Sequence, residues 1–448
     1  MKISIIGGGE IGYALAKALA GDHEVFVMDH DAAISGRFAA LDVQFIHGSA
    51  TSSSDLRRAK VDGADFLVAA TGLDEVNIVA CSIANSLGDP ETVCIVSNDD
   101  LHSPIGERDT LRQHFGIDRI IWPEGQLAAD IERVVAAPGA IDAEVFAGGQ
   151  VRLLEYRLGE ESSLAGQQVA ALGLPHGALL VGLKREDDFF IPHGGTRLQV
   201  ADKVVVMGTR DAMREVQGRV RPGSTSAGPQ LVTIIGGGDV GFRLAQNLDR
   251  VPHVTLRIIE RDAARGEMLA ATLTRALVLS GDGTDLELLE AEQIGASDVL
   301  ISVIDNDERN LLASLLGRQL GVRKIITRVG KPANLRLFER VGIDVALSAR
   351  GAAVQAVIHH VEGGKAHLLA VLEEGQGKVL ELVVPAMFEA TPLRDLGSPR
   401  EAIVGAILRH GTAVVPRGSD VIYPGDHLLV VATADSVDRV RNFFSRPA

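Results

Sequence analysis

The sequence predicts an α/β protein with two Rossmann-like parallel-sheet domains, each followed by a small α+β module. In residues 1–138 and 230–360, short β-branched runs alternate with Ala- and Leu-rich stretches. Such strand–helix alternation implies right-handed crossovers and a parallel sheet. Residues 139–222 and 361–448 change to short strands separated by Gly and Pro turns. The two halves of the 448-residue chain repeat one another, so we expect four domains.

The duplication is carried by ordered blocks at a slowly drifting offset. ISIIGGGEIG at 3–12 matches VTIIGGGDVG at 232–241, an offset of 229. Asp74–Asn77 matches Asp307–Asn310 at offset 233. A final strand follows Asp202 in the first half and Asp426 in the second, at offset 224. Both the front and the back of each half are therefore repeated.

The expected elements of the first half follow from its apolar runs. The front strands are expected at Lys2–Ile6, Glu24–Asp29, Gln44–Ile46, Phe66–Ala70, Val93–Val96 and Arg119–Ile121, with helices between them. The back strands are expected at Leu179–Lys184, Phe189–Pro192 and Lys203–Met207. The stretch Arg219–Pro229 (RVRPGSTSAGP) is rich in Gly, Pro and Ser, which predicts a flexible hinge between the halves.

Composition and charge exclude several classes of protein. Apolar residues make up 46% and charged residues 23%, ordinary globular values, and the net charge is −15. An acidic chain without a basic run argues against binding to nucleic acid and against direct binding to lipid. No apolar run approaches the roughly 18 residues of a membrane span, and MKISIIGGGE has no signal-peptide profile. The two cysteines, Cys81 and Cys94, fit a reduced compartment and core positions.

A glycine-rich loop follows the first strand of each half. Gly7-Gly8-Gly9-Glu10-Ile11-Gly12 is G-x-G-x-x-G in its required place, after a strand and at the start of a helix. Gly7 permits the tight turn, Gly9 admits a pyrophosphate and Gly12 lets the helix pack closely. The counterparts in the second half are Gly236, Gly238 and Gly241. Alone, such a loop is also compatible with a simple glycine-rich turn.

An acidic residue at the end of the second strand strengthens the nucleotide interpretation. Asp29 lies seventeen residues after Gly12, and Glu260 lies nineteen after Gly241. A carboxylate there accepts hydrogen bonds from ribose hydroxyls and repels a 2′-phosphate, which favours NAD(H) or a plain adenosine nucleotide over NADP. At the second site Arg261 could tolerate an additional phosphate, so the preference for NAD(H) over NADP is less secure there. For Asp29, the structural alternative is a solvated carboxylate in a turn.

The order GGGEIG, strand-Asp, GSAT (48–51) and ADFLVAATGLDEVN (64–77) resembles the nucleotide-binding domains of proteins that regulate potassium conductance, the RCK or KTN family. The resemblance covers essentially the whole chain, as two RCK N-type domains (1–138, 230–360) and two RCK C-type modules (139–222, 361–448). It implies a cytoplasmic regulatory subunit that binds NAD(H), with ATP or ADP as further ligands. It also implies a homo-oligomeric ring, a dimer or tetramer, held at the inner face of the membrane by a potassium transporter of the TrkH or TrkG kind.

The resemblance implies two sets of binding residues. The first site comprises Gly7, Gly8, Gly9, Glu10, Ile11, Gly12, Asp29, Ala50, Thr51, Thr71 and Gly72. The second comprises Gly236, Gly237, Gly238, Asp239, Val240, Gly241, Glu260, Asp282, Gly283, Ile304 and Arg328. The family often carries an arginine on the fifth strand. Arg328 supplies it in the second half, whereas the first half has VCIVSN at 93–98, which sets Ser97 against Arg328. The two sites are thus expected to differ. The alternative is that one of them has only a structural role.

Recognisable catalytic strings are absent from the sequence, so the expectation is that the protein is not an enzyme. It contains no H-E-x-x-H, C-x-x-C, G-x-S-x-G or P-loop motif. His359-His360 is interpreted as a helix-end cap, and Asp202 and Asp426 as turn residues. The charges at Lys184-Arg185 and Arg409-His410 are interpreted as solvated, with an anion site as the alternative. Two rivals remain open: an NAD-dependent oxidoreductase, and an assembly that does not respond to ligand.

Overall fold

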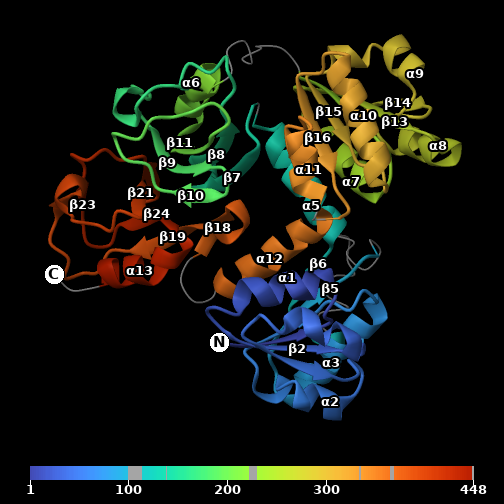
Figure 1. The fold of residues 1–448 in the computed structure, drawn as a ribbon, viewed down its shortest axis with the longest axis horizontal. Coiled ribbons are helices and arrows are strands. Elements are labelled where there is room, and N and C mark those ends of the chain that lie inside the picture. Colours follow the sequence, from blue (N-terminus) through green and yellow to red (C-terminus); the bar gives the residue numbers. More distant parts are fainter. Residues whose placement is uncertain (99–113, 138, 221–229, 332–333, 364–367, 446–448) are drawn as a thin grey trace. The chain divides into compact units, whose positions relative to one another are not determined.

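The computed structural model describes residues 1–448 except 99–113, 138, 221–229, 332–333, 364–367 and 446–448. Among the described residues, no helix has both the length and the apolar character needed to cross a membrane. The chain forms two compact units. One combines residues 1–131 and 230–361, and the other combines residues 132–229 and 362–448. Figure 1 follows the chain through the sheets, from blue to red.

The first unit begins with a six-stranded parallel sheet of order β3-β2-β1-β4-β5-β6. This is the order of a Rossmann fold, and it places the loops after β1 and β4 beside each other. Its elements are β1 Lys2–Ile6, α1 Glu10–Leu19, β2 Glu24–Asp29, β3 Val43–His47, α2 Ser53–Arg58, β4 Phe66–Ala69, α3 Asp74–Leu87, β5 Glu91–Ile95, β6 Arg119–Ile121 and α5 Pro123–Val135.

The strands lie close to the expected positions because β1 and β4 are buried almost throughout, as parallel central strands require. One connection differs from the expected helices. After β2 the chain forms a 3-10 segment, Ala32–Phe38, which Asp31 caps by accepting a hydrogen bond from the N–H of Ala33. Gly36 and the β-branched Ile34 weaken an α-helix at this point.

The second Rossmann-like sheet has the order β14-β13-β12-β15-β16-β17, with all strands parallel. It repeats the first sheet strand for strand, and a true α-helix, α8, stands where the first half has the 3-10 segment. Its elements are β12 Gln230–Ile235, α7 Asp239–Leu248, β13 Val254–Glu260, α8 Ala263–Thr272, β14 Leu277–Ser280, α9 Leu286–Ala291, β15 Val299–Ser302, α10 Asp307–Gln319, β16 Lys324–Arg328, α11 Leu335–Arg340, β17 Val345–Leu347 and α12 Ala349–Gly363.

The second unit contains the two small modules, each built on a five-stranded antiparallel sheet. The first has the order β10-β9-β11-β8-β7 and the second β18-β19-β24-β21-β22. Their elements are β7 Asp142–Phe146, β8 Val151–Arg157, β9 Ala178–Arg185, β10 Asp188–Phe190, β11 Lys203–Gly208 and α6 Arg210–Val220, then β18 Leu368–Leu372, β19 Gly377–Val383, β20 Thr391–Pro392, β21 Ala402–Arg409, β22 Thr412–Val414, β23 Val421–Ile422, β24 His427–Thr433 and α13 Val437–Ser445.

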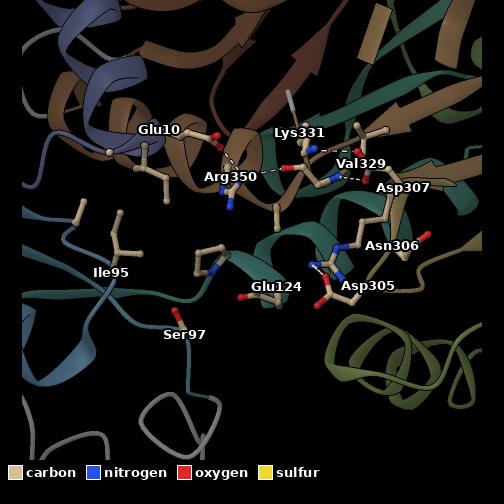
Figure 2. A pocket seen from close by; sticks show the side chains of 18 of the residues that line it. Glu10, Ile95, Ser97, Glu124, Asp305, Asn306, Asp307, Val329, Lys331 and Arg350 are labelled. Carbon is tan, nitrogen blue, oxygen red and sulfur yellow. Dashed lines mark hydrogen bonds and ion pairs between the residues drawn. The ribbon is translucent and has the colours of Figure 1, made fainter. Parts of the chain in front are cut away.

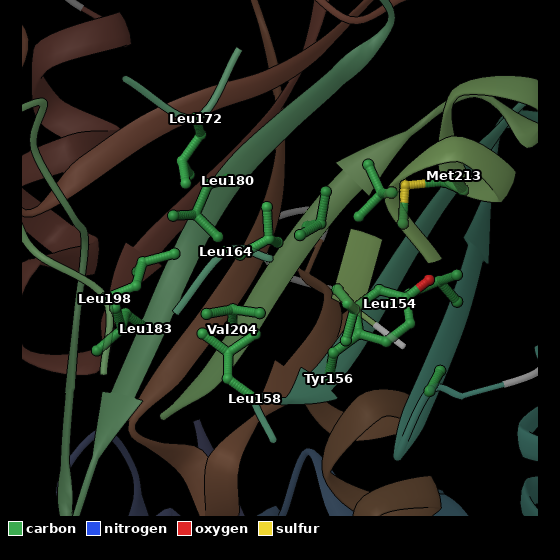
Figure 3. Packing of buried hydrophobic residues seen from close by; sticks show 14 of the residues in the cluster. Leu154, Tyr156, Leu158, Leu164, Leu172, Leu180, Leu183, Leu198, Val204 and Met213 are labelled. Atoms are coloured by element: carbon green, nitrogen blue, oxygen red, sulfur yellow. The ribbon is translucent and has the colours of Figure 1, made fainter. Parts of the chain in front are cut away.

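Each small module has its own core, and a third core joins them. Figure 3 shows the core of the first module, a cluster of buried residues that includes Leu154, Leu183, Val204 and the fully buried Tyr156. The opposite faces of the two sheets meet in a mixed cluster. Buried residues from both modules contribute to it: Val181, Val205, Met207, Ala406, Leu429 and Val431. The predicted α/β class, with parallel sheets followed by small mixed modules, is confirmed. The four domain boundaries stay a prediction.

The first two residues of the expected hinge, Arg219 and Val220, belong to a helix. α6 continues through Val220, and Arg219 donates hydrogen bonds to the carbonyl oxygens of Leu172 and Gly173. Arg219 is therefore part of a packed helix, because its long side chain ties α6 to the loop before β9. The remainder of the expected hinge, 221–229, lies outside the described residues.

A bidentate ion pair repeats in the two small modules. Nε of Arg185 donates to Oδ1 of Asp202 at 2.9 Å, and the same atoms of Arg409 and Asp426 lie 2.7 Å apart. Both carboxylates also accept a hydrogen bond from a backbone N–H in the turn before the last strand. The prediction of turn residues is confirmed. The prediction of solvated charges is wrong for these two arginines, because each forks onto a buried carboxylate.

Lys184 is paired as well, through a contact that links the two small modules. Its ammonium group bonds the carboxylate of Glu373, which Lys203 approaches to 3.3 Å. Lys203 also lies 3.6 Å from Glu155. Burial alone would raise the pKa of Glu373, but the hydrogen bond from Glu155 and the two ammonium charges lower it to about 2. The side chain of Lys184 is thus partly buried and paired within the protein, and it does not form an open anion site.

The Arg409–Asp426 pair predicts acid sensitivity of the second small module. Burial raises the pKa of Asp426, but the bonds from Arg409 and the N–H of Tyr423 outweigh it and lower the pKa. A lowered pKa stabilises the fold above the ordinary carboxyl pKa near 4, and this stabilisation is lost as the pH falls below that value. We expect Asp426→Asn to cost about 2 kcal/mol at neutral pH and less at pH 3, measured by urea unfolding. The exposed Asp438→Asn should change neither value. An equal cost of Asp426→Asn at both pH values would contradict the prediction.

Candidate functional site

Three glycines of the first loop have different structural roles. Gly7 has φ +109°, and a Cβ there would lie 2.4 Å from the carbonyl oxygen of Ala70. A Cβ on Gly12 would lie 1.8 Å from the carbonyl oxygen of Gly7, so only glycine lets α1 approach β1 this closely. A Cβ on Gly9 would meet nothing within 4 Å. The space above Gly9 is therefore open, as a bound pyrophosphate requires.

The second loop repeats this geometry. Gly236 has φ +99°, a Cβ on Gly241 would lie 1.9 Å from the carbonyl oxygen of Gly236, and a Cβ on Gly238 would meet nothing within 4 Å. Helices α1 and α7 start at these loops, and no side chain caps their first N–H groups. The residues present in both loops fit the phosphates of a nucleotide.

The acidic residue at the end of each second strand is tied to its glycine loop. Oδ2 of Asp29 accepts the N–H of Gly8 at 2.7 Å, and Oε2 of Glu260 accepts the N–H of Gly237 at 2.6 Å. The other oxygen of each accepts a backbone N–H two residues further along. The carboxylates are therefore fixed beside the loops. Each oxygen keeps a lone pair for a ribose hydroxyl, since a carboxylate oxygen accepts more than one hydrogen bond.

A buried asparagine on the helix after the fourth strand holds each site together, and the sequence interpretation missed it. Oδ1 of Asn77 accepts from the N–H of Thr71, while its amide donates to the carbonyl oxygen of Ile95 at 2.8 Å. Asn310 likewise binds the N–H of Ile304 and the carbonyl oxygen of Arg328. The two asparagines stood in the repeated block, but their role needs a contact between elements that sequence spacing does not show.

These bonds correct the alignment of the two fifth strands. Because Asn77 binds Ile95 and Asn310 binds Arg328, Ile95 is the counterpart of Arg328. Ser97 instead matches Gly330: each donates its N–H to the aspartate that begins the preceding helix. Setting Ser97 against Arg328 was wrong by two residues. The conclusion that the first half lacks the arginine is unchanged.

The loops after the third strands contribute less than expected. Ala50 is partly buried and Thr51 is exposed, and neither lines a described cavity. Oδ1 of Asp282 accepts from the hydroxyl of Thr284 and from Arg309 at 2.6 Å. The Thr284 bond and the Arg309 charge lower the pKa of Asp282. The Asp282 carboxylate thus already has hydrogen-bond partners within the protein. The neighbouring Gly283 lines the smaller of the two cavities described below.

Two cavities open at these loops. The larger, about 830 Å³, is lined from both halves of the chain, and the smaller, about 380 Å³, lies at the second loop. Predicted residues that line the larger cavity are Gly9, Glu10, Ile11, Thr71, Gly72, Ile304 and Arg328. Those that line the smaller are Gly236, Gly238, Asp239, Val240, Glu260, Gly283, Ile304 and Arg328. The other predicted residues line neither cavity: Gly7, Gly8, Gly12, Asp29, Ala50, Thr51, Gly237, Gly241 and Asp282.

The two cavities share Glu124, Ile304, Asp305 and Arg328. Figure 2 shows Glu124 and Asp305 among the side chains of the larger cavity. Arg328 lies 2.9 Å from the exposed Asp305. Burial raises the pKa of Glu124, the second residue of α5. The two candidate sites therefore border on common charged groups.

The second site contains two arginines that the sequence interpretation did not identify. Arg265 donates to the carbonyl oxygen of Gly237 at 2.6 Å and to Asp239 at 2.9 Å. Arg309 holds Asp282. Arg265 lies on α8, and the first half has only a 3-10 segment in that place. The repeat comparison alone therefore gave no counterpart that would have marked it.

The remaining candidates outside the loops are structural. Cys81 and Cys94 are fully buried, as expected, and their mutual hydrogen bond together with burial raises the pKa of Cys81. His360 is not a helix-end cap, because its Nε2 lies 2.8 Å from Glu91 and its ring packs edge-on against Phe66. Among the described residues, no three His, Cys, Asp or Glu side chains gather in a way that would hold a metal ion.

Comparisons with known proteins agree with the duplicated architecture. The family model of the TrkA-N domain matches residues 3–123 and 232–349, and that of the TrkA-C domain matches residues 153–220 and 379–445. Among solved structures, the RCK domain of GsuK is similar over 98% of this chain and 94% of the GsuK chain, with a TM-score of 0.60 and 18% identity. The GsuK channel bound to NAD covers 99% of this chain at a TM-score of 0.60 and 17% identity. At this identity, the likeness shows a common fold.

Curated relatives match over their full length. Trk system potassium uptake protein TrkA homolog 1 of Methanosarcina mazei is 37% identical, over 99% of this chain and 100% of its own. TrkA of Haemophilus influenzae is 28% identical, over 100% of this chain and 99% of its own. The resemblance to RCK-type regulatory subunits is thereby confirmed. With both domain types present twice, this chain belongs to the TrkA family of Trk system potassium uptake proteins.

Proposed function

We propose that this chain is the nucleotide-sensing regulatory subunit of a membrane potassium uptake system. The observation that carries the proposal is the pair of equivalent loops, Gly7–Gly12 and Gly236–Gly241, each open at its middle glycine and each bonded to an acidic side chain. Full-length relatives named as Trk potassium uptake proteins support the transport role.

NAD(H) is the proposed ligand, with ATP or ADP as competitors for the same loops. The bonds from Gly8 to Asp29 and from Gly237 to Glu260 fix a carboxylate where it accepts the ribose hydroxyls and disfavours a 2′-phosphate. The GsuK channel, 78% of whose chain matches this fold, has been solved with NAD. A ligand shifts the protein between two conformations only by binding them unequally, and a coupling of about 1–3 kcal/mol gives a 5- to 150-fold effect.

The proposed partner is an integral membrane potassium transporter of the TrkH or TrkG kind, bound at the cytoplasmic face. We further propose a homo-oligomeric ring. Support comes from apolar side chains on α10 and α11, two crossover helices that lie on the same face of their sheet. The exposed large apolar residues are Leu312 and Leu315 on α10, Leu337 on α11, and Val341, which directly follows α11. A regulatory role without catalysis fits the names of the relatives, and an NAD-dependent oxidoreductase is the rival.

Two measurements test the proposal. Calorimetry on the whole chain should show binding of NADH or ADP that weakens about tenfold with Asp29→Ala or Glu260→Ala, because each loses a charge-assisted hydrogen bond. Cells that lack the chain should lose potassium uptake, and the wild-type chain should restore it. No nucleotide binding at millimolar concentration, or uptake that does not depend on the chain, would refute the function. Sustained NADH oxidation with any metabolite would favour the oxidoreductase.

A further inference from the structure

We propose that the first nucleotide site is completed by the second half of the chain, and that Arg350 supplies the positive charge for the ligand's phosphates. The inference rests on the nucleotide binding proposed above. It names a residue outside the glycine loops, and it concerns a nucleotide with at least one phosphate group, such as ADP or NAD(H).

The positive charges that line the larger cavity come from the second half of the chain. From the first half, its charged lining residues are Glu10 and Glu124, both acidic. All the basic side chains that line it come from the second half: Arg328, Lys331 and Arg350. The fifth strand of the first half has Ile95 where the second half has Arg328. A phosphate at the first loop therefore meets positive charge only from the second half among the described lining residues.

Arg350 contacts the first glycine loop directly. Its guanidinium donates to the carboxylate of Glu10, the first residue of α1, and to the carbonyl oxygen of Gly330 at 2.9 Å. Figure 2 shows Glu10 and Arg350 pointing toward each other at the cavity. Gly9, next to Glu10, is the open position of the loop. A phosphate above Gly9 would thus lie beside the guanidinium and compete with Glu10 for it.

The surrounding contacts keep Arg350 in this place. The N–H of Gly330 is held by Asp307 at 2.6 Å, which fixes the carbonyl group that Arg350 binds. Near the other end of α12, His360 contacts Glu91 and Phe66 of the first sheet. α12 is therefore anchored on the first Rossmann-like domain near both of its ends, although it belongs to the second half of the chain.

Glu124 is the counterpart of Arg350 in the first half of the chain, and the two residues carry opposite charges. Each is the second residue of the helix that follows the sixth strand: Glu124 on α5 and Arg350 on α12. Glu124 lines the smaller cavity, whose lining already includes four arginines: Arg261, Arg265, Arg309 and Arg328. The first-half residue at this position adds a carboxylate to both cavities, whereas the second-half residue adds an arginine to the larger cavity alone.

The test isolates the first site by blocking the second with Gly238→Val, in the full chain. In that background, calorimetry with ADP should show about 5- to 20-fold weaker binding for Arg350→Gln, the loss of a half-exposed charge-assisted hydrogen bond. Binding of adenosine, which has no phosphate, should stay within about twofold. In the mirror background Gly9→Val, Arg350→Gln should leave ADP binding unchanged, because Arg350 does not line the smaller cavity.

Glu10→Gln separates a ligand contact from a structural bridge. If Arg350 neutralises phosphate, removing its competing carboxylate strengthens ADP binding about threefold or more. If Arg350 only ties α12 to α1, both substitutions break the same bridge and both weaken binding of ADP and adenosine alike. That result, or unchanged ADP affinity in Arg350→Gln while the parent Gly238→Val chain binds ADP, overturns the inference and leaves the proposed function standing. No nucleotide binding by the wild-type chain overturns both.

Discussion

Gly9→Val should abolish nucleotide binding at the first loop and leave the protein folded. Gly9 has φ −63° and an extended ψ, which valine adopts without strain, and a Cβ there meets nothing within 4 Å. The side chain would instead fill the space above the loop that a pyrophosphate needs. We expect affinity for ADP or NADH at this site to fall about 100-fold or more, roughly 3 kcal/mol, by calorimetry. The unfolding free energy should change by about 1 kcal/mol or less.

Gly238→Val is the matched variant for the second loop, where φ is −62° and the surroundings are equally open. Each single variant should retain one class of binding sites, and the double variant should bind nothing and fail to restore nucleotide-dependent potassium uptake. Retention of full two-site binding in the double variant would show that the loops do not hold the ligand. Loss of the fold in either single variant would contradict the open geometry.

Gly12→Ala should have the opposite effect, a large loss of stability caused by one methyl group. The new Cβ would lie 1.8 Å from the carbonyl oxygen of Gly7, so α1 must move away from β1 or the loop must break. Backbone cannot yield as a flexible side chain can, and we expect a cost of about 3 kcal/mol or more. That is a substantial part of the 5–15 kcal/mol that stabilises a typical domain.

Trp122 allows this effect to be located. It is the single tryptophan of the chain and is buried in the core of the first Rossmann-like domain, so its fluorescence follows that domain during urea unfolding. Gly12→Ala should lower the midpoint of the Trp122 transition strongly. The equivalent Gly241→Ala, where the clash is 1.9 Å, should lower it less and destabilise the second domain instead. Equal stability of the Gly12→Ala and Gly9→Val chains would refute the close packing of α1 on β1.

Several parts of the site could be predicted from the sequence because they depend on neighbours in the chain. The tight turn at Gly7 and the close approach at Gly12 follow from a strand that runs directly into a helix. The place of Asp29 follows from the next strand, which pairs in parallel with β1 and ends beside the loop. A strand order built from right-handed crossovers leaves few alternatives for these positions.

Other parts could not be predicted, because they depend on contacts between distant segments. Asn77 acts by reaching the carbonyl oxygen of Ile95, and that bond set the register of the two fifth strands that the sequence comparison misplaced by two residues. Arg265 is positioned by α8, a helix that the other half lacks. His360, expected to cap its own helix, instead meets Glu91 on the first sheet.

By itself, the sequence determined the fold class, the duplication, the two glycine loops and the acid behind each loop. Local hydrogen bonding and side-chain periodicity encode these features, and they repeat wherever the pattern repeats. Only the tertiary structure decided which residues of the two halves line a common cavity. Glu10 and Arg350 are 340 residues apart and meet because α12 packs against the domain of the other half. No local pattern records that packing, since it depends on how the apolar faces of two separately formed sheets and their helices fit together.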